Sequence, residues 1–453
     1  MLKTAPPVLC VIPLYRGEES DNADSKEQED RKSCLLGSME PAPRVGQVFS
    51  PLDEELDLLP GCLTPRQQEH LAHLAIWMPF ERAVQMLERV LGVQVSEPTV
   101  RRGTERAGAC YEARQTAQSQ QSAQVPRQVP ISEKQVGSTD GAYVPLVGGQ
   151  WAEVRTAAIG EVKEEGTAQG HEEVKTSQIS YFSRMTDAMT FGELAEVEMQ
   201  RRGVSQAKAV CAVTDGADWI QGFVDLHRPD AVRILDFAHA AEHVSLLIEA
   251  LEHAGVPLPA QVLKRSLHLL KHRGPRLLLR WCERLPASLA QDEEVHKHLH
   301  YLGKRESMMQ YPLYQQHGWP IGSGMVESAT KVVVQARLKG AGMHWEASHV
   351  NPLLALRAAV CNQRWEEAWQ DSLNEQRALV KSKRHARAVA RVQSQLSSFV
   401  VLLLRFSPPP PKPPLPSPRL PHPAATLPGS SRPSAHHPWK RSPACRPKLS
   451  AKN

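Results

Sequence analysis

Residues 322–331 read GSGMVESATK, a stretch rich in glycine and serine that opens a run of helical spacing. Glu327 is the one acidic side chain among the small and apolar residues of this first turn. Two further acids have matching surroundings, Asp140 within STDGA and Asp215 within VTDGA, where β-prone segments end or break. Three isolated carboxylates in such settings can bind two divalent metal ions. We therefore predict that Asp140, Asp215 and Glu327 form a site for nucleic-acid cleavage or DNA transfer.

The chemistry of phosphodiester transfer explains why three acids belong together. The reaction needs an activated oxygen nucleophile and a stabilised leaving oxygen, and two Mg²⁺ or Mn²⁺ ions can supply both. Such hard cations prefer carboxylate oxygens, so Asp140 would bridge both ions while Asp215 and Glu327 each hold one. The alternative is that Asp-Gly marks an ordinary turn, which is the better explanation for either dipeptide taken alone. The recurrence of both dipeptides after β-prone segments, together with Glu327, favours the metal site.

Composition limits the classes of protein to be considered. A chain of 453 residues with 41% hydrophobic and 23% charged residues can bury the cores of two or three domains. The net charge of +5 permits a nucleic-acid partner without requiring one. The eight cysteines include no Cys-x-x-Cys pair, which argues against a zinc ribbon or a disulfide scaffold and fits a reducing cytoplasm. We expect neither a membrane span nor a signal peptide.

The N-terminal part is predicted to be a disordered segment followed by helices. Residues 1–50 are polar and irregular, whereas residues 51–125 have helical spacing with clear start and stop signals. Thr64 and Gln67 can form a capping box before the first helix, and Gly92 is a stop signal for the second.

This order of helices is typical of a helix-turn-helix DNA-binding region. The third helix, which Ser96 can cap, would place Arg101 and Arg102 near a DNA groove or phosphates. An ordinary three-helix packing unit with solvated arginines explains the pattern equally well, so both interpretations stay open.

Residues 135–370 are predicted to form an α/β domain. The expected elements are strands at 136–147, 151–159 and 179–182, a helix at 190–202, and strands at 209–214 and 232–235. This order matches a ribonuclease H-like mixed sheet, with Asp140 on the first strand and Asp215 at the end of the fourth. Glu327 would then lie on a closing helix, and the helical pattern of residues 243–316 indicates an insertion in the core.

Three residues near the second and third acids are further candidates. Asp236 and His239 follow the last predicted strand, and we expect them to support the site. A zinc site that adds His243 is the alternative, but a histidine pair at this spacing more often packs or forms hydrogen bonds. Trp219 could stack on an unpaired base beside the site or belong to the core.

Basic residues after the glutamate are predicted to contact DNA. Lys331 lies one turn after it and could reach a phosphate, although an ordinary surface lysine fits as well. Arg337 and Lys339 belong to a glycine-rich basic turn, RLKGAGMHW, that could meet DNA. Residues 371–405 are expected to form a basic helix, either solvated or contacting phosphates, and residues 406–453 a Pro-rich disordered tail.

Several strings of this sequence are specific enough to suggest a family. TDGAYVPL, VTDGADWI, ILDFAHAAEH, IGSGMVESATK and RLKGAGMHW together resemble the bacterial insertion-sequence transposases of the Kra type, relatives of the Mutator-like DDE transposases. The resemblance covers about residues 50–370. It implies a ribonuclease H-like catalytic domain with a helical insertion, Mg²⁺-dependent DNA transposition, and a DDE triad at Asp140, Asp215 and Glu327.

The resemblance also implies partners. Transposon ends and target DNA would be bound at the nucleoid, and a homo-oligomer is expected because two ends must be paired. Asp236 and His239 match the Asp-x-x-His signature of the Mutator-like group.

Two departures from the family keep other functions open. PAPR stands where relatives often carry a Cys-x-x-Cys zinc element, and Val334 stands where many carry Lys or Arg. A catalytically decayed transposase that acts as a DNA-end-binding repressor is therefore the main alternative. A host nuclease with the same three acids is a third interpretation.

Overall fold

The computed structural model describes residues 40–41, 48–49, 63–121, 132–166, 172–286, 289 and 292–406. The described residues up to Arg387 belong to one compact unit, and those from Ala388 belong to a second. The predicted Pro-rich tail lies, from residue 407 onward, outside the described residues. No helix in the described parts is both long enough and apolar enough to cross a membrane.

Two short strands precede the helical region. β1 (Glu40–Pro41) and β2 (Val48–Phe49) pair antiparallel. This pair of strands lies within the segment predicted to be disordered, residues 1–50, and the disorder stays a prediction. The rest of that segment lies outside the described residues.

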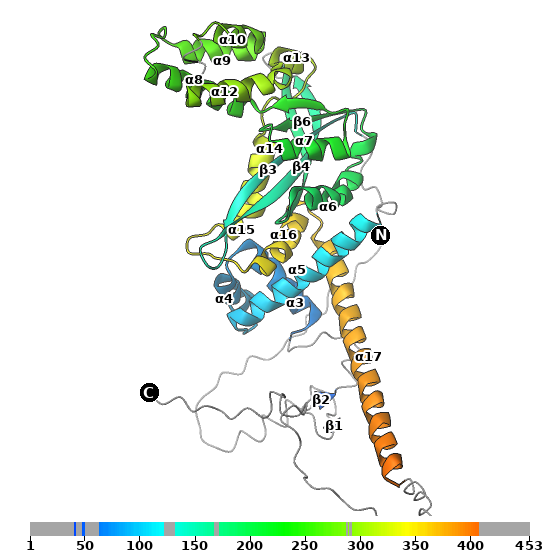
Figure 1. The fold of residues 1–453 in the computed structure, drawn as a ribbon. Coiled ribbons are helices and arrows are strands. Elements are labelled where there is room, and N and C mark those ends of the chain that lie inside the picture. Colours follow the sequence, from blue (N-terminus) through cyan, green and yellow to red (C-terminus); the bar gives the residue numbers. More distant parts are fainter. Residues whose placement is uncertain are drawn as a thin grey trace, which may run out of the picture. The chain divides into compact units, whose positions relative to one another are not determined.

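A five-stranded mixed sheet carries two of the predicted acids (Figure 1). Its strands are β3 (Lys134–Pro145), β4 (Trp151–Gly166), β5 (Glu172–Arg184), β6 (Ala209–Thr214) and β7 (Val232–Leu235). In the order β5-β4-β3-β6-β7, the first three are antiparallel neighbours, whereas β6 is parallel to both β3 and β7. The predicted α/β class and the mixed sheet are confirmed.

The β3–β4 hairpin shows how the sequence produces this sheet. Gly148 and Gly149 have φ values of +82° and +74° in the turn, a conformation that residues with a Cβ rarely adopt. β4 runs past its predicted end at residue 159 because β5 pairs along it, with a bulge between Ile159 and Glu161.

Helices cover both faces of the sheet, because alternate strand residues point to opposite sides. One face carries α6 (Ala188–Arg201) and α7 (Asp218–His227), and the other carries α14 (Gly324–Ala329). α8 (Phe237–His253) follows β7 and packs with the helices after it. Phe191 and Phe223 share the first hydrophobic cluster with Ile159 of β4. Val326 shares the second with Val213 of β6. Asp215 and Glu327 therefore lie on elements of one continuous core.

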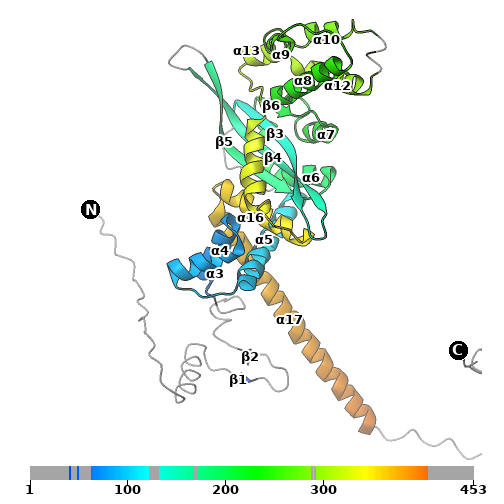
Figure 2. The ribbon, with the colours of Figure 1, turned by 90° about the vertical axis from the view of Figure 1, so that its left-hand side faces the viewer.

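The segment between β7 and α14 is helical, as expected for the insertion. After α8 it contains α9 (Val262–Arg273), α10 (Arg276–Cys282), α12 (Glu293–Lys304), η3 (Glu306–Met309) and α13 (Tyr311–Gln316). Figure 2 shows α8, α9, α10, α12 and α13 gathered beside β6. The Tyr311 hydroxyl donates to the Leu235 carbonyl at 3.0 Å, which ties α13 to the end of β7.

The three predicted N-terminal helices are confirmed. They are α3 (Pro65–Trp77), α4 (Phe80–Leu91) and α5 (Glu97–Gln120). Thr64 and Gln67 form the predicted capping box, and Gly92 ends α4 with a φ of +64°. α5 continues through Gly103, well beyond the basic segment that suggested it. Val100 of α5 shares a hydrophobic cluster with Val144 of β3, so these helices pack with the sheet region.

Two further helices complete the packing. They are α16 (Ala347–Cys361) and α17 (Trp365–Phe406), separated at Gln363, which has a φ of +57°. The predicted basic helix at 371–405 is thus the continuation of α17. α5 crosses α16 at Gly108, where an added Cβ would lie 2.2 Å from the Pro352 carbonyl oxygen. Only glycine allows the two backbones to approach this closely.

Candidate active site

Asp140 lies inside β3, opposite Thr156 of β4. Asp140 thus lies on the first strand, as predicted, but the strand does not break at Thr-Asp-Gly-Ala, because pairing with β4 continues to Pro145. The Gly141 amide donates to Asp140 Oδ1 at 2.7 Å and holds the half-buried carboxylate. A rigid strand therefore positions the first acid.

Asp215 directly follows the last residue of β6, as predicted. Its Oδ1 accepts a hydrogen bond from the Ala217 amide at 2.8 Å, across the turn that leads into α7. Gly216 adopts a φ of +78° in this turn. Because β6 is the parallel neighbour of β3, the two aspartates come from adjacent strands.

Glu327 lies in the first turn of α14, and about half of its side chain is exposed. Lys331 Nζ lies 3.9 Å from its carboxylate, one turn further along. After Ala329 the helix widens into a π-helical segment, η4 (Thr330–Gln335). Such π-segments occur mostly as short interruptions of α-helices and are frequent at functional sites.

The pKa of Asp140 is affected by the charges of the other two predicted acids. Burial raises the pKa of Asp140 above its ordinary value, and the negative charges of Asp215 and Glu327 raise it further. The Gly141 amide and His239 act in the opposite direction. The charges of Asp215, Glu327 and His239 therefore act on Asp140 from elements far apart in the sequence, and repulsion between carboxylates is of the kind that a bound cation relieves.

The donor set fits a hard divalent cation, because it consists of carboxylate oxygens and contains no thiolate. In the described parts of the chain, however, no three His, Cys, Asp or Glu side chains are arranged as ligands of one ion. The type of donor atom therefore fits a divalent cation, whereas the arrangement of the described side chains is not that of a formed metal site. Mg²⁺ is usually held by only one or two carboxylates and keeps several waters.

Asp236 follows β7 and connects this strand to α8 and to the segment before α14. Its Oδ1 accepts from the Ser323 amide at 2.8 Å, and its Oδ2 accepts from the His239 amide at 3.1 Å. The side chain is buried. Asp236 therefore caps α8 and fixes the segment that leads into α14 and Glu327, which agrees with the supporting role predicted for it.

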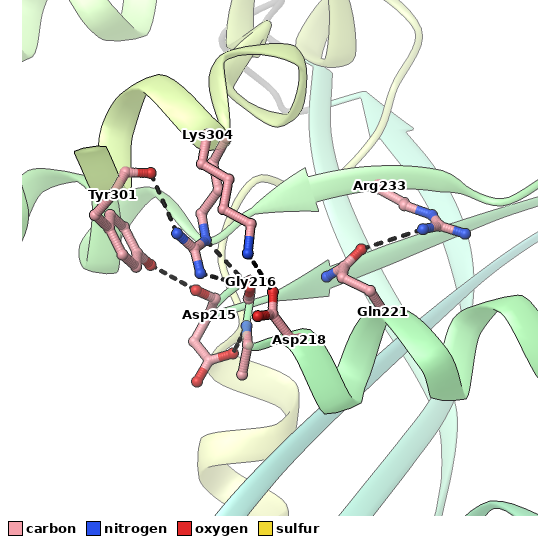
Figure 3. Close-up of polar contacts among 9 residues, drawn as sticks. Asp215, Gly216, Asp218, Gln221, Arg233, Tyr301 and Lys304 are labelled. Carbon is pink, nitrogen blue, oxygen red and sulfur yellow. Dashed lines mark hydrogen bonds and ion pairs between the residues drawn. The ribbon is translucent and has the colours of Figure 1, made fainter. Parts of the chain in front are cut away.

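The loop after Asp215 is held from the insertion, which the sequence reasoning missed. The Tyr301 hydroxyl donates to the Asp215 carbonyl at 2.5 Å, and Arg305 Nη2 donates to the Gly216 carbonyl at 2.8 Å (Figure 3). Lys304 pairs with Asp218 at 2.7 Å. No periodicity or spacing in the sequence connects residues 301–305 to an aspartate 86 positions earlier.

His243 contacts the insertion instead of forming a histidine pair with His239. Its Nδ1 lies 3.0 Å from His298 Nδ1, and its ring stacks on Tyr301 with 3.4 Å between centroids. One of the two Nδ1 atoms must donate and the other accept, so the contact requires a neutral ring. Burial, followed by the positive charges of His298 and Arg305, lowers the pKa of His243 to about 4.

This histidine pair predicts a loss of stability in acid. The unfolded chain takes up the His243 proton near its ordinary pKa of 6.5, whereas the folded chain takes it up only near 4. The free energy of unfolding should therefore fall as the pH drops from about 6.5 to about 4. Urea denaturation between pH 7.5 and 4.5 tests this. His243→Phe, which keeps a ring on Tyr301, should lose part of that pH dependence, and an unchanged profile would contradict the assignment.

The residues predicted to contact DNA differ in how far they are exposed to solvent. Arg101 and Arg102 are exposed on α5, and Lys339 is exposed with Nζ 6.0 Å from the Trp151 ring centroid. Trp219 is half-buried against Phe191, and the Arg155 guanidinium lies over its ring. The packing of Trp219 is that of a residue at the core boundary, so its contact with a base stays a prediction.

The structure contradicts the predicted DNA contact of Arg337. Its side chain is buried, and its Nε donates to the Ala75 carbonyl at 2.8 Å. The guanidinium lies over the rings of Phe80 and Trp345, and burial lowers its pKa to about 10. A DNA phosphate cannot reach it, because α3 and two aromatic rings surround it. Arg337 instead joins α15 (Ala336–Leu338) to the N-terminal helices.

Comparison with protein-family models found none that matches this chain, and comparison with curated proteins found no significant match. The assignment of a function therefore depends on the residues and the geometry of the chain itself.

Proposed function

We propose that this protein is a DDE-type DNA transposase that cleaves transposon ends and transfers the strands into target DNA. The observation that carries this assignment is that Asp140 lies on β3, Asp215 directly after the adjacent parallel strand β6 and Glu327 on α14, with the charges of the last two acting on Asp140. The strand order β5-β4-β3-β6-β7 supports a ribonuclease H-like topology, with one acid on β3, one at the end of β6 and one on α14. The sequence strings that resemble Kra-type transposases add independent support.

Each part of the site has a definite task in this mechanism. The carboxylates of Asp140, Asp215 and Glu327 would hold two Mg²⁺ or Mn²⁺ ions. When bound, these ions supply charge stabilisation at the attacking and leaving oxygens of the phosphodiester. The chain itself sets the direction of the carboxylates, through strand pairing for Asp140 and through Asp236 for the helix that carries Glu327. Lys331, exposed one turn after Glu327, would contact a phosphate.

The main alternative is a decayed transposase that binds element ends and represses. The presence of all three carboxylates favours the enzyme, whereas the missing N-terminal Cys-x-x-Cys element favours the repressor. A host nuclease with the same site would cut DNA without joining ends and without preferring terminal repeats.

The test is a cleavage and joining assay on linear DNA that carries the element's two ends, with a plasmid as the target. We expect nicks or breaks at the ends and joined products with Mg²⁺, and neither with EDTA. Binding of the ends without cleavage would establish the repressor. Cleavage that ignores the ends and yields no joined product would establish the nuclease.

A separate prediction concerns the exposed arginines of α5. If Arg101 and Arg102 contact phosphates, changing both to Ala should weaken DNA binding at every sequence. It should also reduce the slope of log K against log salt concentration by about 2, because each contact releases about one counterion. Arg276→Ala, which removes an exposed charge from α10, is the matched control. Titrations by fluorescence anisotropy at several salt concentrations measure the slope, and an unchanged slope in the double variant would favour an ordinary packing unit.

A further inference from the structure

We propose that Tyr301 and Arg305 of the insertion are positioning residues for Asp215, an inference that rests on the proposed function. They hold the two consecutive backbone carbonyls of Asp215 and Gly216, so that the Asp215 carboxylate faces Asp140. The insertion would then contribute residues that position the active site.

The contacts involve two consecutive carbonyl groups. The Tyr301 hydroxyl donates to the Asp215 carbonyl at 2.5 Å. Arg305 donates to the Gly216 carbonyl twice, from Nη2 at 2.8 Å and from Nε at 3.1 Å. Tyr301 lies in the last turn of α12 and Arg305 directly follows this helix, and both donate to the aspartate loop, residues 215–217. Figure 3 shows the Tyr301 side chain reaching the Asp215 carbonyl.

The aspartate loop is a place where such support matters. Pairing between β6 and β7 reaches Thr214, which is opposite Leu235, and the chain leaves the sheet at the next residue. Gly216 then turns with a φ of +78°, and an added Cβ there would lie 2.4 Å from Arg305 Nε. The turn and the Arg305 side chain therefore fit closely, and the loop conformation that aims the carboxylate depends on both.

The donors are themselves fixed. The Tyr301 ring stacks on His243 of α8 at 3.4 Å with 5° between the planes. The Arg305 guanidinium lies 3.8 Å from the Tyr301 ring centroid and donates to the Tyr301 carbonyl at 3.2 Å. Side chains held in this way lose little rotamer freedom when they donate to the loop, as expected of a positioning shell.

A purely structural role is the competing explanation, because the same contacts also attach α12 to the sheet. Tyr314 provides the matched control. Its hydroxyl donates to the Ser307 carbonyl at 2.7 Å and to the Arg233 carbonyl at 3.2 Å, also where the insertion meets the sheet. Tyr→Phe at either position removes buried hydrogen bonds of one type, but only Tyr301 touches the aspartate loop.

The experiment compares the full chain with Tyr301→Phe and Tyr314→Phe by three measurements. Hydrogen exchange of the peptide that contains the Ala217 amide reports on the loop, since that amide donates to the Asp215 carboxylate. Electron paramagnetic resonance measures Mn²⁺ binding, and the end-cleavage assay measures the rate. Tyr301→Phe should speed exchange and weaken both Mn²⁺ binding and cleavage by about 10-fold to 100-fold. Tyr314→Phe should match the wild type in all three, even if both variants melt at a lower temperature.

The outcomes separate this inference from the proposed function. Equal Mn²⁺ binding and equal loop exchange in the two variants would overturn the positioning role, whatever the cleavage rate. A wild-type chain that binds Mn²⁺ but cleaves no DNA would refute the transposase, while the Mn²⁺ comparison would still decide the role of Tyr301. A wild-type chain that binds no Mn²⁺ would overturn both.

Discussion

Asp140→Asn is expected to lower the rate of metal-dependent DNA cleavage by about a thousandfold or more, the equivalent of several kcal/mol of transition-state stabilisation. The charges of Asp215 and Glu327 act on this carboxylate, and a neutral amide cannot replace its charge toward a divalent cation. The matched control is Asp230→Asn, because Asp230 is exposed and paired with Arg228. The control should cleave element ends at the wild-type rate. Cleavage kinetics at saturating Mg²⁺, with DNA binding checked in parallel, measure the effect.

The same substitution is expected to leave the fold as stable as the wild type, or more stable, when divalent metal is absent. Burial and the neighbouring carboxylates raise the pKa of Asp140 above its ordinary value of 3.8. The unfolded chain therefore releases this proton at lower pH than the folded chain, and the free energy of unfolding falls as the pH rises between the two values. At neutral pH the ionised Asp140 carboxylate lowers the free energy of unfolding, and the neutral Asn side chain removes this destabilisation.

Thermal denaturation in EDTA at pH 7 separates loss of chemistry from loss of fold. The account predicts an inactive Asp140→Asn variant with an equal or higher melting temperature. An inactive variant that melts well below the wild type would show that Asp140 serves the fold, and would remove the main evidence for a metal site.

Gly108→Ala should lower the free energy of unfolding by roughly 2–3 kcal/mol. The new Cβ would lie 2.2 Å from the Pro352 carbonyl oxygen and 2.6 Å from its carbonyl carbon. Both are backbone atoms inside α16, so no side-chain rotation can relieve the overlap and the two helices must move apart. The cluster that contains Ala107, Ala355 and Leu356 would lose contacts as a result.

Gly222→Ala is the matched control, because it makes the same chemical change in a helix where space is free. No atom lies within 4 Å of the added Cβ in α7. Alanine should then raise the free energy of unfolding by about 0.5–1 kcal/mol, through helix propensity. Urea denaturation of both variants measures the two changes, and a destabilisation of equal size in both would contradict the close approach of α5 and α16.

The parts of the fold that follow from local patterns were predictable. β6 and β7 have the predicted bounds, because each is a short apolar run between turn signals. The capping box at Thr64 and the stop at Gly92 are likewise encoded within a few residues. Asp215 was placed correctly for the same reason, since its strand ends at the neighbouring residue.

The errors arose where distant segments decide the structure. Asp140 lies on the first strand as expected, but the break expected at Thr-Asp-Gly is absent, because pairing with β4 carries the strand five residues further. Arg337 looked like a surface charge, but carbonyl and aromatic partners from α3 and α4 bury it. No pattern in one sequence places the Tyr301 hydroxyl on the Asp215 carbonyl, since the loop and α12 meet only in the folded chain.

Glu327 is the third carboxylate of the proposed site, and it lies on α14, far in the sequence from the strands that position the two aspartates. The decisive measurement is Mg²⁺-dependent cleavage and joining of element-end DNA by the wild type and by Glu327→Gln, with end binding measured for both. We expect that Glu327→Gln binds the ends as tightly as the wild type and yields neither cleaved nor joined DNA. Cleavage by Glu327→Gln at the wild-type rate would contradict the three-carboxylate site.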